Sequence, residues 1–192
     1  NSRKEYLEML KQKKKNDELK KRLDKIQREG YMDEIPLDQY DKNFINKVKQ
    51  IAKKINCDYQ DLLGVMNSES DLNPKAYNSN GGASGLIQFM PATAKSYGVT
   101  TEQLRNMSPL KQLDYVERYL VDCKKIAGFG DSRLSAGDLY SLVFLPSRAK
   151  RDILCKKGEN YYEQNSALDI NHDGKITKAE MQVRVENHRV YA

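Results

Sequence analysis

The sequence lacks several features that would assign it at once to a common class. Its three cysteines, Cys57, Cys123 and Cys155, include no C-x-x-C pair, which excludes a zinc knuckle and a thioredoxin-like motif. Because the count is odd, at least one thiol is unpaired within the chain, and we expect small buried hydrophobic side chains rather than a disulfide framework. The chain also has no apolar run long enough to span a bilayer and no signal-peptide core near Asn1.

The net charge of +6 suits any polyanion, including nucleic acid, anionic lipid or cell-wall polymers. Lys and Arg are mixed with Asp and Glu almost everywhere, and neither an aromatic-basic strand pattern nor zinc-finger spacing is present. We therefore expect no nucleic-acid partner. Since the chain begins with Asn rather than Met, we expect a processed product or a piece of a longer protein.

Residues 1–34 are predicted to form a charged helical arm or linker. They are rich in Lys, Glu, Asp and Arg, with no Pro or Gly before Gly30, as in a solvated helix. Two short groups of apolar residues keep helical spacing: Tyr6, Met9 and Leu10, then Leu19, Leu23 and Ile26. They cover too few heptads to predict a coiled coil. A connecting arm and a helix that binds a partner both remain open, with a joint to the core at 30–41.

Residues 35–165 are predicted to form one mostly α-helical domain. Apolar side chains at helical spacing from Phe44 to Ile55 predict a first core helix, and Asp58 can cap the next. Further helices are expected to begin near Pro91, Pro109 and Ser135. No stretch alternates like a β-hairpin.

Glu69 ends an otherwise apolar helical segment and is followed by a loop that contains Asn73-Pro74. One side of its carboxyl group therefore faces a packed core. Desolvation, close to the negative end of the helix dipole, should raise the pKa of Glu69 and keep it protonated near neutral pH. A general acid for glycosidic cleavage needs this property, although most glutamates at helix ends are simply exposed.

Two motifs at a fixed separation carry a family resemblance. Glu69-Ser70 is followed by Asn73-Pro74-Lys75-Ala76, then by Gly85-Leu86-Ile87-Gln88-Phe89-Met90-Pro91-Ala92-Thr93-Ala94. Over residues 44–149 the sequence resembles soluble lytic transglycosylases, which are related to goose-type lysozymes, so a lysozyme-like fold is expected. The resemblance implies that Glu69 is the acid and then the base, that Ser70 orients the substrate, and that Gly85, Leu86 and Gln88 line the saccharide cleft.

The resemblance also implies chemistry with one carboxylate and no catalytic cofactor. Most glycosidases use two carboxylates, with substrate-assisted enzymes as an exception. In this family the acetamido oxygen of N-acetylmuramic acid (MurNAc) is thought to stabilise the cationic centre, and the same Glu then deprotonates the 6-hydroxyl to give a 1,6-anhydro product. Asp71 and Asp138 are candidates for a second carboxylate, which would favour hydrolysis. We expect instead that Asp71 caps a turn and Asp138 lies in a first helical turn.

One departure from the family concerns a tyrosine. Many members have Ala-Tyr-Asn at the end of the last core helix, where this chain has Leu142-Val143-Phe144-Leu145-Pro146. The segment from Asp138 to Ala149 and the later Tyr162-Glu163-Gln164-Asn165 resemble a variant found in bacteriophage cell-wall lytic domains. Tyr140 or Tyr162 is a candidate for the replacement hydroxyl, and Asn165 for a cleft residue, with a structural role as the alternative for each.

Residues 166–192 are predicted to form an EF-hand-like calcium loop and a C-terminal helix. Residues 169–180 match the loop pattern, with oxygen side chains at positions 1, 3, 5, 9 and 12, glycine at position 6 and an apolar residue at position 8. The expected ligands are Asp169, Asn171, Asp173, the carbonyl of Lys175, Thr177 and Glu180. The segment before Asp169 is too short for a full entering helix, so we expect a structural Ca²⁺ rather than a sensor.

The sequence thus predicts a mostly α, lysozyme-like domain that cleaves the bond between MurNAc and N-acetylglucosamine (GlcNAc) in peptidoglycan. The alternatives are a hydrolytic muramidase on the same scaffold and a non-catalytic glycan-binding module of a virion or secretion assembly. The resemblance implies a place in a phage virion tail, or secretion, and action in the bacterial periplasm or cell wall. Other virion or tail proteins are candidate partners of the N-terminal helix.

Overall fold

The computed structural model describes residues 2–29 and 37–190, without the side chains of residues 2, 20, 22–29 and 37–41. The predicted joint at 30–41 and the side chains of Leu23 and Ile26 therefore lie outside the described residues, except for the backbone of 37–41. The described part is mostly helical, as predicted. Within it, no helix is long and apolar enough to cross a membrane.

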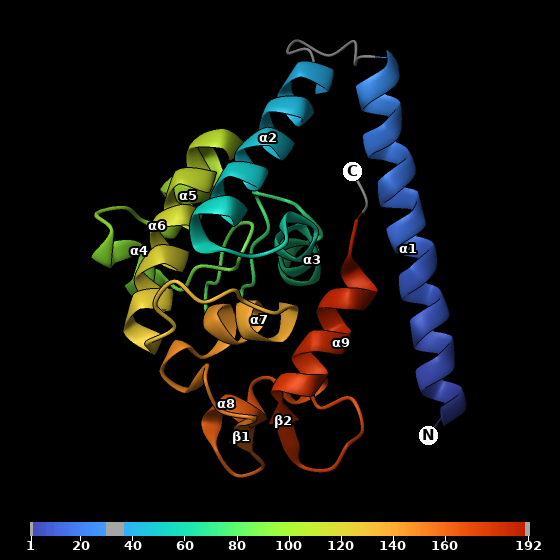
Figure 1. Cartoon of the computed structure of the whole chain (residues 1–192), viewed down its shortest axis with the longest axis vertical. Helices are drawn as coiled ribbons and strands as arrows, with labels where there is room; N and C mark the ends of the chain where they lie inside the picture. Colours follow the sequence, from blue (N-terminus) through green and yellow to red (C-terminus); the bar gives the residue numbers. More distant parts are fainter. Residues whose placement is uncertain (1, 30–36, 191–192) are drawn as a thin grey trace.

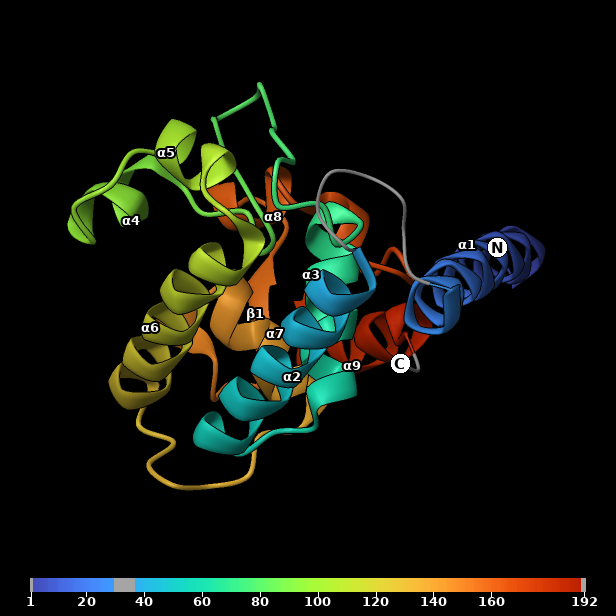
Figure 2. The ribbon, with the colours of Figure 1, turned by 90° about the horizontal axis from the view of Figure 1, so that it is seen from above.

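The core lies between four helices: α2 (Leu37–Ile55), α3 (Tyr59–Ser70), α6 (Pro109–Ala127) and α7 (Ala136–Phe144). Helix α3 is buried on nearly all sides, and its residues Leu62, Leu63, Val65 and Met66 are fully buried. The predicted face of α2 is confirmed, since Val48, Ile51 and Ile55 are buried in the same core. Helices α2 and α6 pack against each other (Figure 2).

Capping residues set the helix starts that the sequence predicted. Asp58 caps α3 by accepting a hydrogen bond from the backbone N–H of Gln60 at 2.7 Å. Ser135 and Asp138 form a capping box at the start of α7. Helices α4 (Pro91–Ser96) and α6 have proline in the first helical position, while α5 (Thr101–Asn106) lies between them.

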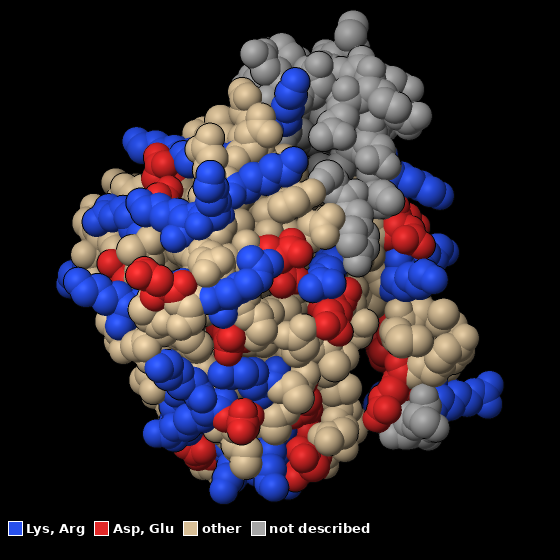
Figure 3. Space-filling view, viewed as in Figure 1, with Lys and Arg blue, Asp and Glu red and all other residues tan. Residues whose placement is uncertain are grey.

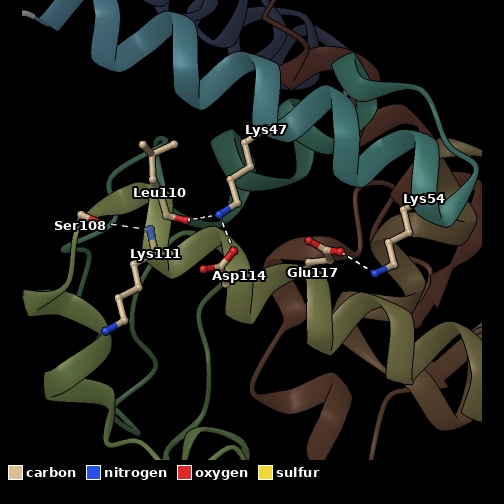
Figure 4. A network of polar contacts seen from close by, with 7 residues as sticks. All are labelled: Lys47, Lys54, Ser108, Leu110, Lys111, Asp114 and Glu117. Carbon is tan, nitrogen blue, oxygen red and sulfur yellow. Dashed lines mark hydrogen bonds and ion pairs between the residues drawn. The ribbon is translucent and has the colours of Figure 1, made fainter.

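Surface ion pairs join α2 to α6. Lys47 reaches both the carbonyl oxygen of Leu110 and the carboxylate of Asp114, and Lys54 pairs with Glu117 at 2.8 Å (Figure 4). Most of these side chains are partly or largely exposed, so each pair stabilises the fold by about 1 kcal/mol or less.

Helix α1 (Ser2–Glu29) lies along one side of the molecule, beside α9 (Lys178–His188) (Figures 1 and 2). Its apolar residues Tyr6, Leu7, Met9 and Leu10 are more than one-third exposed. Lys15 pairs with Asp71, just beyond the end of α3. The predicted charged helix is therefore confirmed between residues 2 and 29, and it lies against the core rather than apart from it.

The C-terminal part contains a two-stranded antiparallel sheet that the sequence did not predict. It pairs β1 (Ile153–Lys156) with β2 (Lys175–Thr177). The 3-10 turns η1 (Pro146–Arg148) and η2 (Ser166–Leu168) and the short helix α8 (Asn160–Glu163) complete this region. Each strand is too short for an alternating pattern, which explains the missed assignment.

Helix α9 packs tightly between α3 and α7. A Cβ atom on Gly64 of α3 would lie 2.9 Å from the carbonyl oxygen of Val185, and one on Gly137 of α7 would lie 2.9 Å from that of Lys178. Met181 and Val185 are fully buried in the contact. Glycine at both crossing points thus lets α9 become part of the core.

The cysteine prediction is confirmed, because Cys57, Cys123 and Cys155 are all buried free thiols. Burial raises the pKa of Cys57 to about 12 and that of Cys123 to about 11, so neither is poised as a nucleophile. Over the face shown in Figure 3, basic and acidic side chains are interspersed.

Candidate functional site

Glu69 lies in the last turn of α3, where the buried helix meets the loop that follows. As a residue it is only partly buried, but its carboxyl group is strongly desolvated, and burial raises its pKa. A hydrogen bond with Tyr140 and the positive charge of Arg184 act in the opposite direction. The direction predicted for this pKa is therefore confirmed, and its main cause is the packing around the carboxyl group.

A chain of hydrogen bonds runs from α9 to Glu69. The Nε of Arg184 donates to the hydroxyl of Ser68 at 2.7 Å, and that hydroxyl lies 3.1 Å from the hydroxyl of Tyr140. The Tyr140 hydroxyl in turn bonds the Glu69 carboxyl group. Tyr140, one of the two tyrosines proposed as replacements, thus comes from the middle of α7 rather than from its end.

Tyr119 of α6 is a further neighbour that sequence reasoning missed. Its pKa is raised, mainly by burial and also by the charge of Glu69. Its hydroxyl donates to the carbonyl oxygen of Val143, and it lines a surface cavity of about 410 Å³ between α4 and α6. This cavity has the size that ligand sites commonly have, but Glu69 is not among the residues that line it.

The two aspartates considered as second carboxylates have other partners. Asp71 is the left-handed cap of α3 and pairs with Lys15. Asp138 belongs to the capping box of α7 and pairs with Lys178 at 2.9 Å. Burial tends to raise the pKa of Asp138, but hydrogen bonds from Lys178 and Ser135 lower it. Both expected structural roles are thus confirmed.

Ser70, Gly85 and Leu86, which were expected to orient the substrate or line the cleft, join α3 to the turn at Gly85. The Ser70 hydroxyl lies 2.8 Å from the carbonyl oxygen of Leu86, to which it donates, and it also bonds that of Met66. Leu86 is fully buried, which corrects the expectation that its side chain lines the cleft. Gly85 has φ +85°, and a Cβ there would lie 2.6 Å from Gln112 Oε1, so this position requires glycine.

Gln112 of α6 is the centre of this arrangement, and the sequence analysis missed it. It is fully buried, and its side chain accepts from the backbone N–H of Leu86 at 2.7 Å. Its Nε2 donates to the carbonyl oxygens of Pro74 and Leu104. A lone amide on the buried face of an amphipathic helix is the signal that could have identified it.

Gln88 remains a candidate for substrate contact. It is partly exposed, with a left-handed backbone at φ 57°, a conformation that costs a non-glycine residue free energy and is common at functional sites. Its Nε2 donates to the carbonyl oxygen of Gly85 at 3.1 Å. Ile87 and Phe89, on either side of Gln88, are buried in the core.

Tyr162 and Asn165 form their hydrogen bonds with residues other than Glu69. The buried Tyr162 donates its hydroxyl to Asp169 at 2.6 Å, within the calcium-type loop. The side chain of Asn165 donates to the carbonyl oxygen of Tyr161. The structure therefore gives Tyr162 a role in supporting the loop rather than in replacing the family's tyrosine.

The loop at 169–180 brings oxygen ligands together. Carboxylate oxygens of Asp169, Asp173 and Glu180 all lie within 4.8 Å of one another. Gly174 has φ +81° and donates its N–H to Asp169 at 2.9 Å. All-oxygen donors around a glycine turn fit the ligand chemistry of Ca²⁺.

The elements that flank this loop differ from those of a paired EF-hand. Helix α9 begins at position 10 of the loop, but only α8 and the turn η2 precede it, as expected from the sequence. Strand β2, at positions 7 to 9, pairs with β1 rather than with a second loop. His172 is exposed at a non-ligand position.

Comparison with known proteins finds a similarity in the central part of the chain. Residues 46–128 match the family described as transglycosylase SLT domain. A 49-residue segment is 53% identical to a protein named Transglycosylase from Enterobacteria phage PRD1, over 26% of this chain and 18% of that protein. The match thus spans less than a fifth of that relative. No solved structure matches. The resemblance to SLT transglycosylases is therefore confirmed for a region that includes Glu69 and Gln88 but not α7 or α9.

Proposed function

We propose, on the premise that residues 46–128 form a transglycosylase SLT domain, that this protein is a lytic transglycosylase of bacterial peptidoglycan. It would cleave the glycosidic bond between MurNAc and GlcNAc, and its product would be a 1,6-anhydro sugar. The observation that carries the proposal is the desolvated carboxyl of Glu69, with a raised pKa and the Tyr140 hydroxyl beside it. An acid that holds its proton near neutral pH can protonate a leaving sugar oxygen.

The proposed reaction uses Glu69 twice. Its proton goes to the glycosidic oxygen as the bond from that oxygen to C1 of MurNAc breaks, and the acetamido oxygen of the same sugar stabilises C1. The ionised Glu69 then removes the proton from the 6-hydroxyl, whose oxygen bonds to C1. Glu69 ends protonated as it began, and no water is consumed.

The partners of the nearby aspartates support this route over hydrolysis. Asp71 pairs with Lys15, and Asp138 pairs with Lys178. Among the described residues, the charge that shifts the pKa of Glu69 is that of Arg184, which lowers it. Apart from substrate-assisted enzymes, a hydrolytic muramidase uses a second carboxylate in reach of the sugar.

Substitution of Glu69 tests the proposal. Glu69→Gln keeps the shape of the side chain but removes the acid, so clearance of purified peptidoglycan sacculi should fall by about 10²–10⁴-fold or more. Glu117→Gln, which alters a surface glutamate paired with Lys54, is the matched control and should clear sacculi at the wild-type rate. Equal clearance by wild type and Glu69→Gln would overturn the proposal, and binding of sacculi without cleavage would indicate a glycan-binding module.

We further propose that the loop at 169–180 binds Ca²⁺ through Asp169, Asn171, Asp173, the Lys175 carbonyl, Thr177 and Glu180. The close approach of its three carboxylates and its glycine turn support this. The ion would supply positive charge that holds the carboxylates together at the start of α9, and it has no part in the sugar chemistry.

We also propose that the protein acts in the cell wall during phage infection, because the similar Transglycosylase comes from a phage. The exposed apolar residues of α1 are the candidate contact with other virion or tail proteins. Mass spectrometry of purified virions should detect this chain. Its presence only in the lysate of infected cells, and never in virions, would contradict a virion location.

A further inference from the structure

Helix α9 lies outside the region that matches the SLT domain, yet it contributes Arg184, whose positive charge lowers the pKa of Glu69. Arg184 is partly buried, and its Nε donates to Ser68 Oγ at 2.7 Å. Ser68 directly precedes Glu69 on α3. Arg184 therefore reaches the site across the interface between α9 and α3, without touching the carboxyl group itself in the recorded contacts.

When Glu69 is ionised, its carboxylate can only accept, so the single hydroxyl proton of Tyr140 goes to Glu69 and the hydrogen bonds of this chain have one order. An arginine N–H can only donate, so the Ser68 oxygen accepts from Arg184. The Ser68 hydroxyl is then free to donate to Tyr140, 3.1 Å away. Tyr140 thereby accepts one bond and donates its own hydroxyl proton to Glu69. This order aims a donor at Glu69, which favours the ionised carboxylate over the acid.

We infer that Arg184 is a positioning residue for Glu69, acting through Ser68 and Tyr140 to stabilise the carboxylate that forms once the proton has been given to the leaving sugar. The inference rests on the proposed function, in which Glu69 must act as an acid and then as a base. Burial favours the first state, and the chain from Arg184 favours the second. The catalytic unit therefore includes the C-terminal helix.

The way in which α9 is held supports this role. Besides the two glycine contacts, Asn67 donates to the carbonyl oxygen of His188 at 3.0 Å, and Arg189 bonds Asp61 at 2.7 Å. The backbone N–H of Gly137 donates to Gln182 at 2.7 Å. Arg184 lies between these anchors, so its distance from Ser68 is fixed by packing rather than by a free side chain.

The groups that face Glu69 come from three helices besides its own. They are Tyr140 of α7, Arg184 of α9 and Tyr119 of α6, whose pKa is affected by the charge of Glu69. Both tyrosines have a raised pKa and stay neutral over the working range. Arg184 is thus the charged side chain through which substitution can move the titration of Glu69.

The direct test is a titration of Glu69 in protein with ¹³C-labelled glutamate side chains, with Glu69→Gln to assign the signal. Arg184→Met should raise the pKa of Glu69, and Ser68→Ala should raise it by less. Arg189→Met removes a similar cation directly after the same helix, so it should lower the melting temperature yet leave the Glu69 titration unchanged. An unmoved titration in Arg184→Met, or an equal shift in Arg189→Met, would overturn the inference.

Kinetics give a second readout that a purely structural role would not produce. Because the reactive form of the free enzyme is protonated at Glu69, the alkaline limb of the kcat/KM profile should move to higher pH in Arg184→Met. Its kcat should fall roughly tenfold, a fraction of the 10²–10⁴-fold that acid–base catalysis supplies, and Arg184→Lys should restore part of the loss. A fall in activity with an unmoved limb would refute the inference.

The two proposals fail separately. The carboxyl titration needs no substrate, so it tests the link from Arg184 to Glu69 directly. Full activity of Glu69→Gln would overturn the proposed function, and the positioning role with it. An inactive Glu69→Gln combined with an unmoved titration in Arg184→Met would overturn the positioning role alone.

Discussion

At the scale of single residues, the burial of the Glu69 carboxyl group destabilises its ionised form, and the proposed acid chemistry depends on this effect. A carboxyl group at the end of a buried helix is deprived of water, and the hydrogen bond from Tyr140 and the charge of Arg184 offset only part of that loss. Its raised pKa means that the folded state holds the proton more tightly than the unfolded state does. The contribution of Glu69 to stability is therefore present at low pH and is lost as pH rises through the folded-state pKa.

Replacement of Glu69 by Gln should therefore stabilise the fold at neutral pH while it abolishes activity. The amide is neutral and nearly the same shape, so the cost of a buried ionised group disappears. Thermal unfolding at pH 7 and pH 4 measures the effect, with each kcal/mol worth about 2–4 °C in a protein of this size. A melting temperature below that of the wild type at pH 7 would show that the carboxylate is well stabilised.

Gly85 gives a residue-scale test of the turn that follows the site. Gly85→Ala should cost about 1–3 kcal/mol for the left-handed backbone, plus the contact with Gln112 Oε1. Gly98→Ala is the matched control, since Gly98 has φ +79° but nothing within 4 Å of a Cβ atom. Urea unfolding should rank Gly85→Ala as the more damaging change, and equal costs would indicate that the contact with Gln112 is unimportant.

Sequence patterns could predict Glu69 because a charged residue at the end of an apolar segment is visible in one dimension. They could not predict Arg184 or Gln112, which gain their roles through contacts with α3 and the Gly85 turn far away in the chain. For Leu86 the resemblance indicated a cleft residue, whereas the backbone of Leu86 makes the hydrogen bonds and its side chain fills the core. A sequence pattern also could not decide whether Tyr140 or Tyr162 lies beside Glu69, because both depend on contacts between distant segments.

At the scale of elements, the helices were predictable and the strands were not. Caps such as Asp58 and Ser135, together with proline at helix starts, define helix boundaries within a few residues of sequence. Strand β1 has no such local signal, because it exists by pairing with β2 in the calcium-type loop. The tight crossing of α9 over Gly64 and Gly137 also depends on residues distant in sequence.

Chelation of Ca²⁺ should show how much the calcium-type loop contributes to the stability of the fold. If the loop binds Ca²⁺, a free ion concentration of 100 times Kd adds about 2.7 kcal/mol to stability, or roughly 5–10 °C in melting temperature. EDTA should remove this gain in the wild type. Asp169→Asn should melt at one temperature with or without Ca²⁺, whereas Asp152→Asn, at an exposed site outside the loop, should respond as the wild type does. Absence of any Ca²⁺ response in the wild type would contradict the proposal.

The buried His188 at the end of α9 predicts that the stability of the fold depends on pH. Burial lowers the pKa of His188 from 6.5 to about 4, so the unfolded chain binds a proton at a pH where the folded chain does not. The contribution of His188 is complete above pH 6.5 and falls as pH decreases toward 4, by about 3 kcal/mol in all.

Urea unfolding between pH 7 and pH 4 isolates this effect. His188→Gln should be less stable than the wild type at pH 7, because the ring's hydrogen bond with the carbonyl oxygen of Arg184 is lost. It should nevertheless lose less stability on acidification. The exposed His172 serves as the control, and a His172→Gln variant should keep the wild-type slope. Parallel slopes for wild type and His188→Gln would contradict the buried neutral ring.

At the scale of the whole molecule, the region that matches the SLT domain and the C-terminal part form one packed unit. The family match ends at residue 128, but α7 supplies Tyr140 and α9 supplies Arg184 to the same carboxyl group. Interspersed surface charges and three buried thiols agree with what composition alone predicted. The contact of α1 with α9 did not follow from its charged, weakly periodic sequence.

Removal of residues 166–192 should therefore damage the core rather than trim a tail. It would expose the faces of α3 and α7 on which Met181 and Val185 are fully buried, each worth about 1.5–3 kcal/mol when buried. We expect the shortened chain to lose its cooperative thermal transition, as measured by circular dichroism. A transition at the wild-type temperature would show that α9 is an appendage.

The account depends most on the claim that one carboxyl group does the work of acid and base without water. Digestion of purified sacculi in ¹⁸O-labelled water, followed by mass spectrometry of the released muropeptides, tests this directly. We predict 1,6-anhydro ends that carry no label with the wild-type protein, and no release with Glu69→Gln. Muropeptides with one labelled oxygen at a reducing end would show that water attacks the sugar, and would contradict the account.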